Sequence, residues 1–263
     1  MARAKRHYIP GHIWHLTHRC HKREFLLKFS KDRQRYLQWL YQAKKRYKLV
    51  ILDYIVTSNH VHLLVLDAGK RNVIPRSMQL VAGRTGQEYN QRKNRKGAYW
   101  EDRYHATAVE SGDHLARCIA YIDANMVRAG VVSHPSQWPF SGYNEIQSPR
   151  RKNVLIDYDR LQGLFDADTY DQLRDSHRGW VEEYLGNGSI GREGEWTDSI
   201  AVGSKAFIAK VKMFLGVKAK GRHVLKGAEG YHLREEAAPY NPFFRAKKND
   251  IGFENTYFWD ITT

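Results

Sequence analysis

Two features of the sequence predict an α+β fold. Stretches with apolar residues at about every second position, as in strands, are separated by longer stretches with apolar residues three or four positions apart, as in helices. These stretches follow one another in the order strand, helix, strand, strand, helix, strand, and no internal repeat interrupts them. Strands and helices mixed in this order are expected to form one sheet with helices packed against it.

The first half of this order lies in residues 12–65. Residues 12–20 (HIWHLTHRC) alternate as a strand does, and residues 31–47 have helical spacing, with Ser30 available as the N-cap. Two apolar runs follow at residues 49–56 and 60–65, joined only by the short turn TSN. So short a connection predicts an antiparallel pair.

The second half begins with a helix expected over residues 75–92. Short extended pieces follow around Tyr99 and residues 106–109, and then a helix over residues 113–129 that Gly130 would close. The complete order is that of a ferredoxin-like split βαβ antiparallel sheet, with one further helix appended. We expect the helices of this sheet to lie on one face.

The chain is expected to divide in two. Residues 1–147 form the sheet domain, and the segment SPRRKN (148–153) reads as a linker to an accessory region, residues 148–263, whose role the sequence does not reveal. Frequent glycines in that region indicate short helices on loops, so a mostly helical extension is expected. Its helices are expected over residues 159–165, 170–185 and 201–215.

The excess of positive over negative charge is confined to one part of the chain. The formal net charge is +15, with 26 Lys and Arg against 11 Asp and Glu in residues 1–150, and 17 of each in residues 151–263. A polyanion is the expected partner, because Lys and Arg that neutralise phosphates release condensed counterions. The alternative is a solvated basic surface that serves solubility.

Length and cysteine content predict a soluble protein from a reducing cellular compartment. At 263 residues the chain can bury a full core without disulfides, and it has only Cys20 and Cys118. It has neither an apolar run of membrane-spanning length nor a hydrophobic leader. We expect a soluble bacterial protein of the cytoplasm, associated with the nucleoid when it acts, with no membrane span.

Two histidines separated by one residue, His60 and His62, stand at the start of the third expected strand (TSNHVHLLV). Because side chains alternate faces along a strand, both imidazoles project from the same face and can share one ligand. The pair alone fits either a metal site or two polar residues bonded to backbone or water at a strand entry.

The helix expected over residues 113–129 supplies further polar groups. At about 100° per residue, one stripe is apolar and should face the sheet: Leu115, Ile119, Ile122 and Met126. The neighbouring stripe is polar: His114, Arg117, Tyr121, Asn125 and Arg128. Tyr121 is a candidate nucleophile, although a tyrosine on a half-buried helix face often serves only packing, and Tyr104 in WEDRYH is a rival.

A divalent metal would connect these groups. Two imidazoles fill only part of a coordination shell, and Asn125 would add a neutral oxygen, leaving positions for water and a phosphate oxygen. Mixed nitrogen and oxygen ligands favour Mg²⁺ or Mn²⁺, and zinc is disfavoured without a thiolate or a third imidazole. Tyr121 would then stand close enough to attack a phosphorus atom whose oxygen the metal polarises.

Several motifs occur in a characteristic order: His60-Val61-His62, WEDRYHATAVES (100–111), YIDANMVRAGVV (121–132) and SQWPFSGY (136–143). Over about residues 7–145 the chain thereby resembles the single-tyrosine HUH transposases, particularly the REP-associated tyrosine transposases. The resemblance implies the same split βαβ sheet. It also implies His60, His62 and Asn125 as metal ligands and Tyr121 as the nucleophile. Met126 departs from the proline common there, which makes the end of the helix less predictable.

The function predicted from the residues and the resemblance together is transfer of single strands of DNA next to hairpins. Tyr121 would form a 5′-phosphotyrosine intermediate that a 3′-hydroxyl later reverses without ATP, with single-stranded or hairpin DNA as the partner. The protein could act as a monomer or a homodimer. The groups expected to contact DNA are Arg117, Arg128, Arg92, Lys93, Arg95, Lys96, Trp100, Arg103 and Tyr104.

Two other functions stay open from the sequence. A sheet of this kind with a basic face and aromatic side chains can bind single-stranded nucleic acid without any chemistry. A metal-dependent phosphoesterase would use water in place of tyrosine and would release a free 5′-phosphate without a protein adduct.

Overall fold

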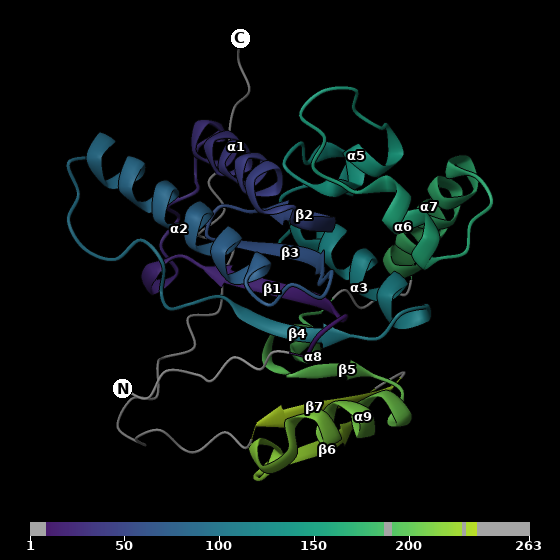
Figure 1. The fold of residues 1–263 in the computed structure, drawn as a ribbon. Helices are drawn as coiled ribbons and strands as arrows, with labels where there is room; N and C mark the ends of the chain where they lie inside the picture. Colours follow the sequence, from purple (N-terminus) through teal and green to yellow (C-terminus); the bar gives the residue numbers. More distant parts are fainter. Residues whose placement is uncertain (1–8, 187–190, 228–229, 236–263) are drawn as a thin grey trace.

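The computed structural model describes residues 9–186, 191–227 and 230–235, and in these the strands form one seven-stranded sheet (Figure 1). The strands are β1 (Ile13–Arg19), β2 (Val50–Val56), β3 (His60–Leu66), β4 (His105–Val109), β5 (Ala201–Gly203), β6 (Arg222–Lys226) and β7 (Tyr231–Glu235). The α-helices are α1 (Ser30–Tyr47), α2 (Val73–Arg92), α3 (Asp113–Asp123), α4 (Asn125–Arg128), α5 (Gly142–Gln147), α6 (Tyr158–Leu164), α7 (Tyr170–Gly186), α8 (Gly194–Asp198) and α9 (Lys205–Leu215).

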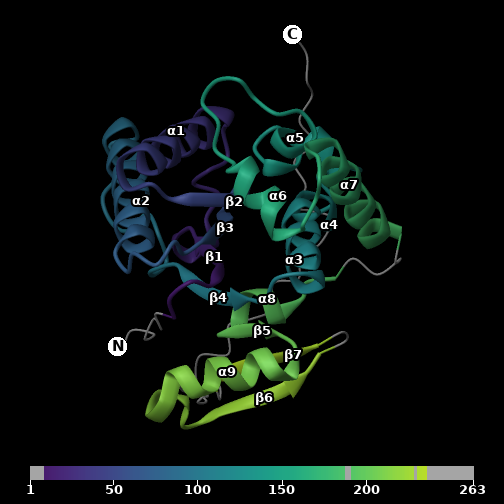
Figure 2. The ribbon, with the colours of Figure 1, turned by 45° about the vertical axis from the view of Figure 1, so that its right-hand side comes forward.

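The first four strands confirm the predicted α+β class and its strand order. They lie in the order β2-β3-β1-β4, and every neighbouring pair among them is antiparallel. The crossover helices α1 and α2 pack against each other and lie on the same face of the sheet, as the split βαβ pattern predicts (Figure 2).

The opposite face is not open to solvent, so the expectation that the helices lie on one face holds only for α1 and α2. Figure 2 shows α3, α4 and α7 on the other side of the sheet. Strand β1 shows the consequence, since Leu16 is 1% exposed and the neighbouring His15 is 0% exposed although the two point to opposite faces. His15 of β1 and His62 of β3, which share the face toward α3, are therefore enclosed between the sheet and that helix.

The C-terminal region is less helical than predicted, because it also extends the sheet. Strand β5 pairs in parallel with β4, and β7 and β6 continue the sheet beyond it (Figure 1). Helices α6 and α7 fall close to their predicted ranges. The helix expected over residues 201–215 is instead β5 followed by α9, whose N-cap Ser204 accepts a hydrogen bond from the Phe207 N–H at 3.1 Å. A three-residue strand is too short to show a period, which is why the sequence pattern missed it.

The helix predicted over residues 113–129 is divided at Ala124 into α3 and α4. All four residues of its apolar stripe are buried, as predicted: Leu115, Ile119, Ile122 and Met126. Gly130 ends α4 with a positive φ of 67°, and the Val131 N–H donates to the Met126 carbonyl at 3.0 Å. The prediction that Gly130 closes this segment is confirmed, and the division places Asn125 at the first position of α4.

In the described part of the chain, none of the helices combines the length and the apolar character that crossing a bilayer requires. Residues 148–153 form an irregular connection, and the proposed boundary between residues 147 and 148 stays a prediction.

Candidate metal site and nucleophile

His60 and His62 occupy the first and third positions of β3, on the face toward α3. In the antiparallel pairing with β1, His62 lies opposite Thr17 and His60 lies opposite Arg19. The His62 side chain is buried, and its ring centroid is 5.0 Å from that of His60. The two imidazoles are therefore neighbours on one face, as the His-x-His spacing predicts.

The turn before β3 holds the His60 ring. Its Nδ1 lies 2.7 Å from the Asn59 side-chain oxygen, which can only accept, so Nδ1 carries the proton and Nε2 carries the lone pair. The Thr57 hydroxyl, 3.0 Å from Nδ1, donates to the His60 carbonyl at 2.8 Å. Burial, together with Arg19 and Arg128, lowers the pKa of His60 to about 4, so the ring is neutral at pH 7.

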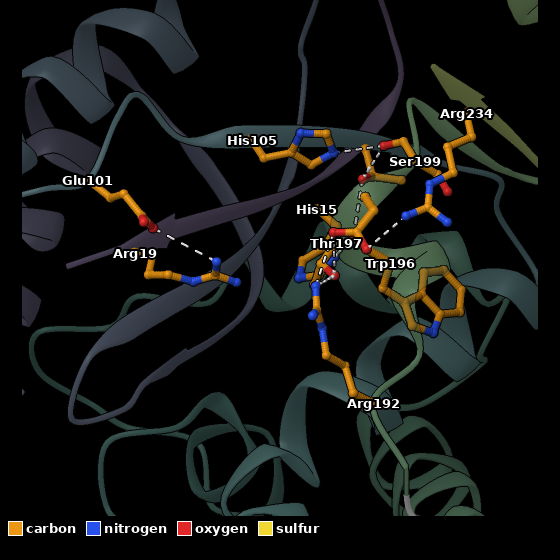
Figure 3. Close-up of polar contacts among 11 residues, drawn as sticks. His15, Arg19, Glu101, His105, Arg192, Trp196, Thr197, Ser199 and Arg234 are labelled. Atoms are coloured by element: carbon orange, nitrogen blue, oxygen red, sulfur yellow. Dashed lines mark hydrogen bonds and ion pairs between the residues drawn. The ribbon is translucent and has the colours of Figure 1, made fainter. Parts of the chain in front are cut away.

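His62 is held by a third imidazole that the sequence did not single out. Its Nδ1 lies 2.7 Å from Nε2 of His15, and the two ring planes differ by only 13°. The Nδ1 of His15 in turn donates to the Trp196 carbonyl at 3.0 Å (Figure 3). Burial lowers the pKa of His15 to about 3 and that of His62 well below its usual value, so both rings are neutral.

Asn125 joins the two histidines from the helical side. Its amide nitrogen lies 3.2 Å from Nε2 of His62, and its side chain also hydrogen-bonds His60. Rotation of the Asn125 side-chain amide by half a turn would exchange its nitrogen and oxygen, so that the oxygen would lie beside His62. The three predicted ligands are thus together in the structure.

The donor set fits a divalent cation with mixed ligands. Both imidazoles use Nδ1 for hydrogen bonds to protein, which leaves each Nε2 for a metal. Within the described ranges, no three His, Cys, Asp or Glu side chains are grouped to hold a metal ion, and the amide oxygen of Asn125 stays the predicted third protein ligand. The identity of the metal stays a prediction, Mg²⁺ or Mn²⁺.

Tyr121 lies beside this cluster. Its ring centroid is 6.1 Å from that of His62 and 6.3 Å from that of His15, and the ring is edge-on to both. The residue is 2% exposed, with the ring of Trp196 at 6.1 Å on another side. The rival Tyr104 is also buried and lies just before β4.

Arg128 acts directly on Tyr121. Its guanidinium lies over the phenol ring at 3.9 Å from the centroid, and it donates to the Tyr121 carbonyl at 2.6 Å. Burial raises the pKa of Tyr121, and the positive charge of Arg128 opposes that rise. Arg128, expected to bind DNA, therefore also favours the ionised phenol.

Three of the other residues predicted to contact DNA already have protein partners, so a bound DNA would share these side chains with the fold: Arg117, Arg92 and Arg95. Arg117 pairs with Glu195 at 3.4 Å. Arg92 forms an ion pair with the buried carboxylate of Asp32, and the Arg95 guanidinium donates to the Ala98 carbonyl at 2.9 Å. The basic cluster at the end of α2 therefore also stabilises the fold.

The loop before β4 borders the end of the sheet that carries His60. Trp100 pairs with Cys20, whose N–H donates to the Asn59 carbonyl at 2.8 Å. One face of the Trp100 ring is stacked on the His18 ring, with 4.0 Å between the ring centroids. A DNA base could therefore stack only on a part of the indole that His18 does not cover. The following predicted contacts are exposed: Lys93, Lys96 and Arg103.

Sequence reasoning missed two residues of the site, His15 and Arg19. Both are in β1 and point to the same face as Thr17, and Arg19 also forms an ion pair with Glu101 at 3.8 Å (Figure 3). The signal that could have found them is the presence of several polar side chains in an otherwise apolar strand. The register between β1 and β3 decides which of these meet His60 and His62, and the sequence does not give that register.

Replacement of Asn125 tests the metal ligands without DNA. We expect Asn125→Ala to weaken Mn²⁺ binding roughly tenfold or more, because one oxygen ligand is lost. Asn125→Asp, which keeps an oxygen and adds a negative charge, should bind Mn²⁺ at least as tightly as the unmodified chain. Electron paramagnetic resonance titration of free Mn²⁺ measures both, and unchanged affinity in Asn125→Ala would remove this residue from the site.

Comparison with known proteins finds similarity to transposases. Residues 9–125 match the family model described as "Transposase IS200 like". A solved structure of a REP-associated tyrosine transposase bound to a REP hairpin is 20% identical, with 57% of this chain and 87% of that chain covered and a TM-score of 0.48. A putative transposase from Deinococcus radiodurans R1 is 18% identical, with 43% and 89% covered and a TM-score of 0.32. No curated protein matches the chain.

Proposed function

We propose, from the match of residues 9–125 to the IS200-like transposase family model, that the chain cleaves and rejoins single-stranded DNA beside hairpins through a covalent tyrosine intermediate. The observation that carries the proposal is the position of Tyr121, with its ring 6.1 Å from that of His62 and Asn125 one helical turn further on. The candidate nucleophile and the candidate donor set for a divalent cation are thus close together, which supports the proposal.

The proposed step exchanges one phosphoester bond for another. The Tyr121 hydroxyl oxygen attacks the scissile phosphorus and loses its proton, while the bond from phosphorus to the 3′-oxygen breaks and that oxygen leaves as a 3′-hydroxyl. The 5′-phosphate stays on the tyrosine. A 3′-hydroxyl reverses the step, so no external energy source is required. A divalent cation bound by His60, His62 and Asn125 would polarise a phosphate oxygen and stabilise the negative charge that develops on this oxygen during the attack.

The protein's own groups prepare this step. Arg128 holds the Tyr121 carbonyl and places a positive charge over the phenol ring, which favours the oxyanion that attacks. The excess of Lys and Arg in residues 1–150 supports binding of a polyanion along the same part of the chain.

The experiment uses the full chain and single-stranded oligonucleotides that carry the inverted repeats flanking its gene. With Mn²⁺ present, we expect cleavage of an end-labelled oligonucleotide next to a hairpin. Without divalent metal, or in the double variant His60→Ala with His62→Ala, we expect binding by gel shift but no cleavage.

Two results would favour other functions. Binding without cleavage at any metal concentration would support a non-catalytic module. Cleavage that leaves a free 5′-phosphate and no protein-bound DNA would support a phosphoesterase in which water attacks. The lengths and end groups of the products on a denaturing gel separate both results from strand transfer.

A further inference from the structure

The segment that contains Trp196 and Ser199 is hydrogen-bonded to the sheet beside the candidate metal site, on the side of β1. The carbonyls of Trp196, in the middle of α8, and of Ser199, just after α8, accept hydrogen bonds from side chains of β1 and β4 (Figure 3). His15 donates to the Trp196 carbonyl at 3.0 Å, and His105 donates to the Ser199 carbonyl at 2.8 Å. The Thr107 hydroxyl lies 3.1 Å from the first carbonyl and 2.7 Å from the second.

The Trp196 carbonyl decides which nitrogen of His15 carries its proton. A carbonyl oxygen can only accept, so the proton of the neutral ring lies on Nδ1 and the lone pair lies on Nε2. That Nε2 faces Nδ1 of His62 at 2.7 Å, and two lone pairs cannot face each other at that distance. The proton of His62 must therefore lie on its Nδ1, which leaves its Nε2 with the lone pair.

The direction of the His62 lone pair is the one that metal binding requires. Nε2 of His62 points to Asn125, whose amide nitrogen is 3.2 Å away and can donate to it. In the other tautomer a proton on Nε2 would occupy this position, and a metal could bind only after His62 had exchanged tautomers.

We propose that His15 is a positioning residue that, through the Trp196 carbonyl, fixes His62 in the tautomer able to bind a metal through Nε2. The proposal rests on the metal site of the proposed function. It gives the segment around α8 a role in that site: the backbone of Trp196 sets the proton arrangement of a ligand in β3. His15 itself does not contact the metal.

The tautomer can be measured in the metal-free protein, independently of any activity. We expect ¹⁵N-¹H correlation spectra of the imidazole nitrogens to show the proton of His62 on Nδ1 in the unmodified chain. In His15→Leu, which fills the space but cannot accept a hydrogen bond, we expect a mixture of tautomers or a proton on Nε2. A proton on Nδ1 of His62 in both proteins would overturn the proposal.

Metal affinity gives the second readout. We expect His15→Leu to bind Mn²⁺ about 10- to 100-fold more weakly, the usual effect of removing a partner of a ligating histidine. His15→Gln, whose amide oxygen can accept from Nδ1 of His62, should recover most of the affinity. The matched control is His105→Gln, which changes a histidine bonded to the same segment but not to His62 and should leave the affinity unchanged.

The outcomes separate this proposal from the proposed function. If the unmodified chain binds no Mn²⁺ while its His62 is protonated on Nδ1, the role of His15 in fixing the His62 tautomer stands and the metal-dependent function fails. If the unmodified chain binds Mn²⁺ and both His15→Leu and His15→Gln bind it equally well, the function stands and the positioning role of His15 fails. Equal loss in His15→Leu and His15→Gln, without recovery, would also contradict the role as a hydrogen-bond acceptor.

Discussion

Tyr121→Phe is expected to abolish DNA cleavage, with a loss of at least about 1,000-fold in the single-turnover rate, because it removes the attacking oxygen. The substitution keeps the ring between His15, His62 and Trp196, so packing should be preserved. Cleavage of a labelled hairpin oligonucleotide in Mn²⁺ is the measurement, with binding of the same oligonucleotide measured beside it.

The matched control is Tyr104→Phe, which removes the same oxygen from another buried tyrosine within residues 9–125. Tyr104→Phe keeps the aromatic ring through which Tyr104 is expected to contact DNA, so we expect it to cleave at close to the unmodified rate, and both variants to bind the hairpin with unchanged affinity. Loss of cleavage in Tyr104→Phe with activity retained in Tyr121→Phe would exchange the roles of the two tyrosines.

Glu145→Ala is expected to lower the free energy of unfolding by about 3 kcal/mol or more, since each buried donor left without a partner costs about 1–3 kcal/mol. The Glu145 carboxylate is 0% exposed and accepts hydrogen bonds from the N–H groups of Leu155 and Ile156 at 2.7 and 2.8 Å. The Tyr54 hydroxyl donates to its other oxygen at 3.0 Å. Glu145 therefore connects the chain after the 148–153 segment to β2. Urea-induced unfolding monitored by circular dichroism measures the loss.

Glu145→Gln controls for the shape of the side chain, because its amide oxygen can still accept the two backbone N–H groups. We expect it to lose clearly less stability than Glu145→Ala. Equal losses in the two variants would show that the negative charge, rather than the acceptor positions, stabilises this connection. An unchanged free energy of unfolding in Glu145→Ala would show that the connection contributes little to the fold.

The sequence predicts the core of the fold and the proximity of the candidate ligands because both depend on local patterns. Alternation and helical spacing are enough to place β1 to β3, α1 and α2, and their order leaves few possible arrangements of the sheet. His60 and His62 share a face by the period of a strand, and Tyr121 lies one turn from Asn125 by the period of a helix. The structure brings these residues together, although their chemical roles stay predictions.

The remainder of the site depends on long-range pairing that no local pattern contains. His15 meets His62 only through the register of β1 with β3, and it meets the Trp196 carbonyl across 181 residues of sequence. Strand β5 has three residues and becomes a strand only because β4 and β7 lie beside it. Tertiary contacts of this kind decide the structure where local preference is weak.

The most direct test of the account is to identify the residue that becomes attached to DNA. The full chain is incubated with Mn²⁺ and a hairpin oligonucleotide labelled on the 3′ side of the cleavage site, denatured, and digested for mass spectrometry. We expect a labelled adduct that survives denaturing electrophoresis, with the 5′-phosphate on the peptide that contains Tyr121. An adduct on a different residue, or efficient cleavage with no adduct, would contradict the proposed tyrosine mechanism.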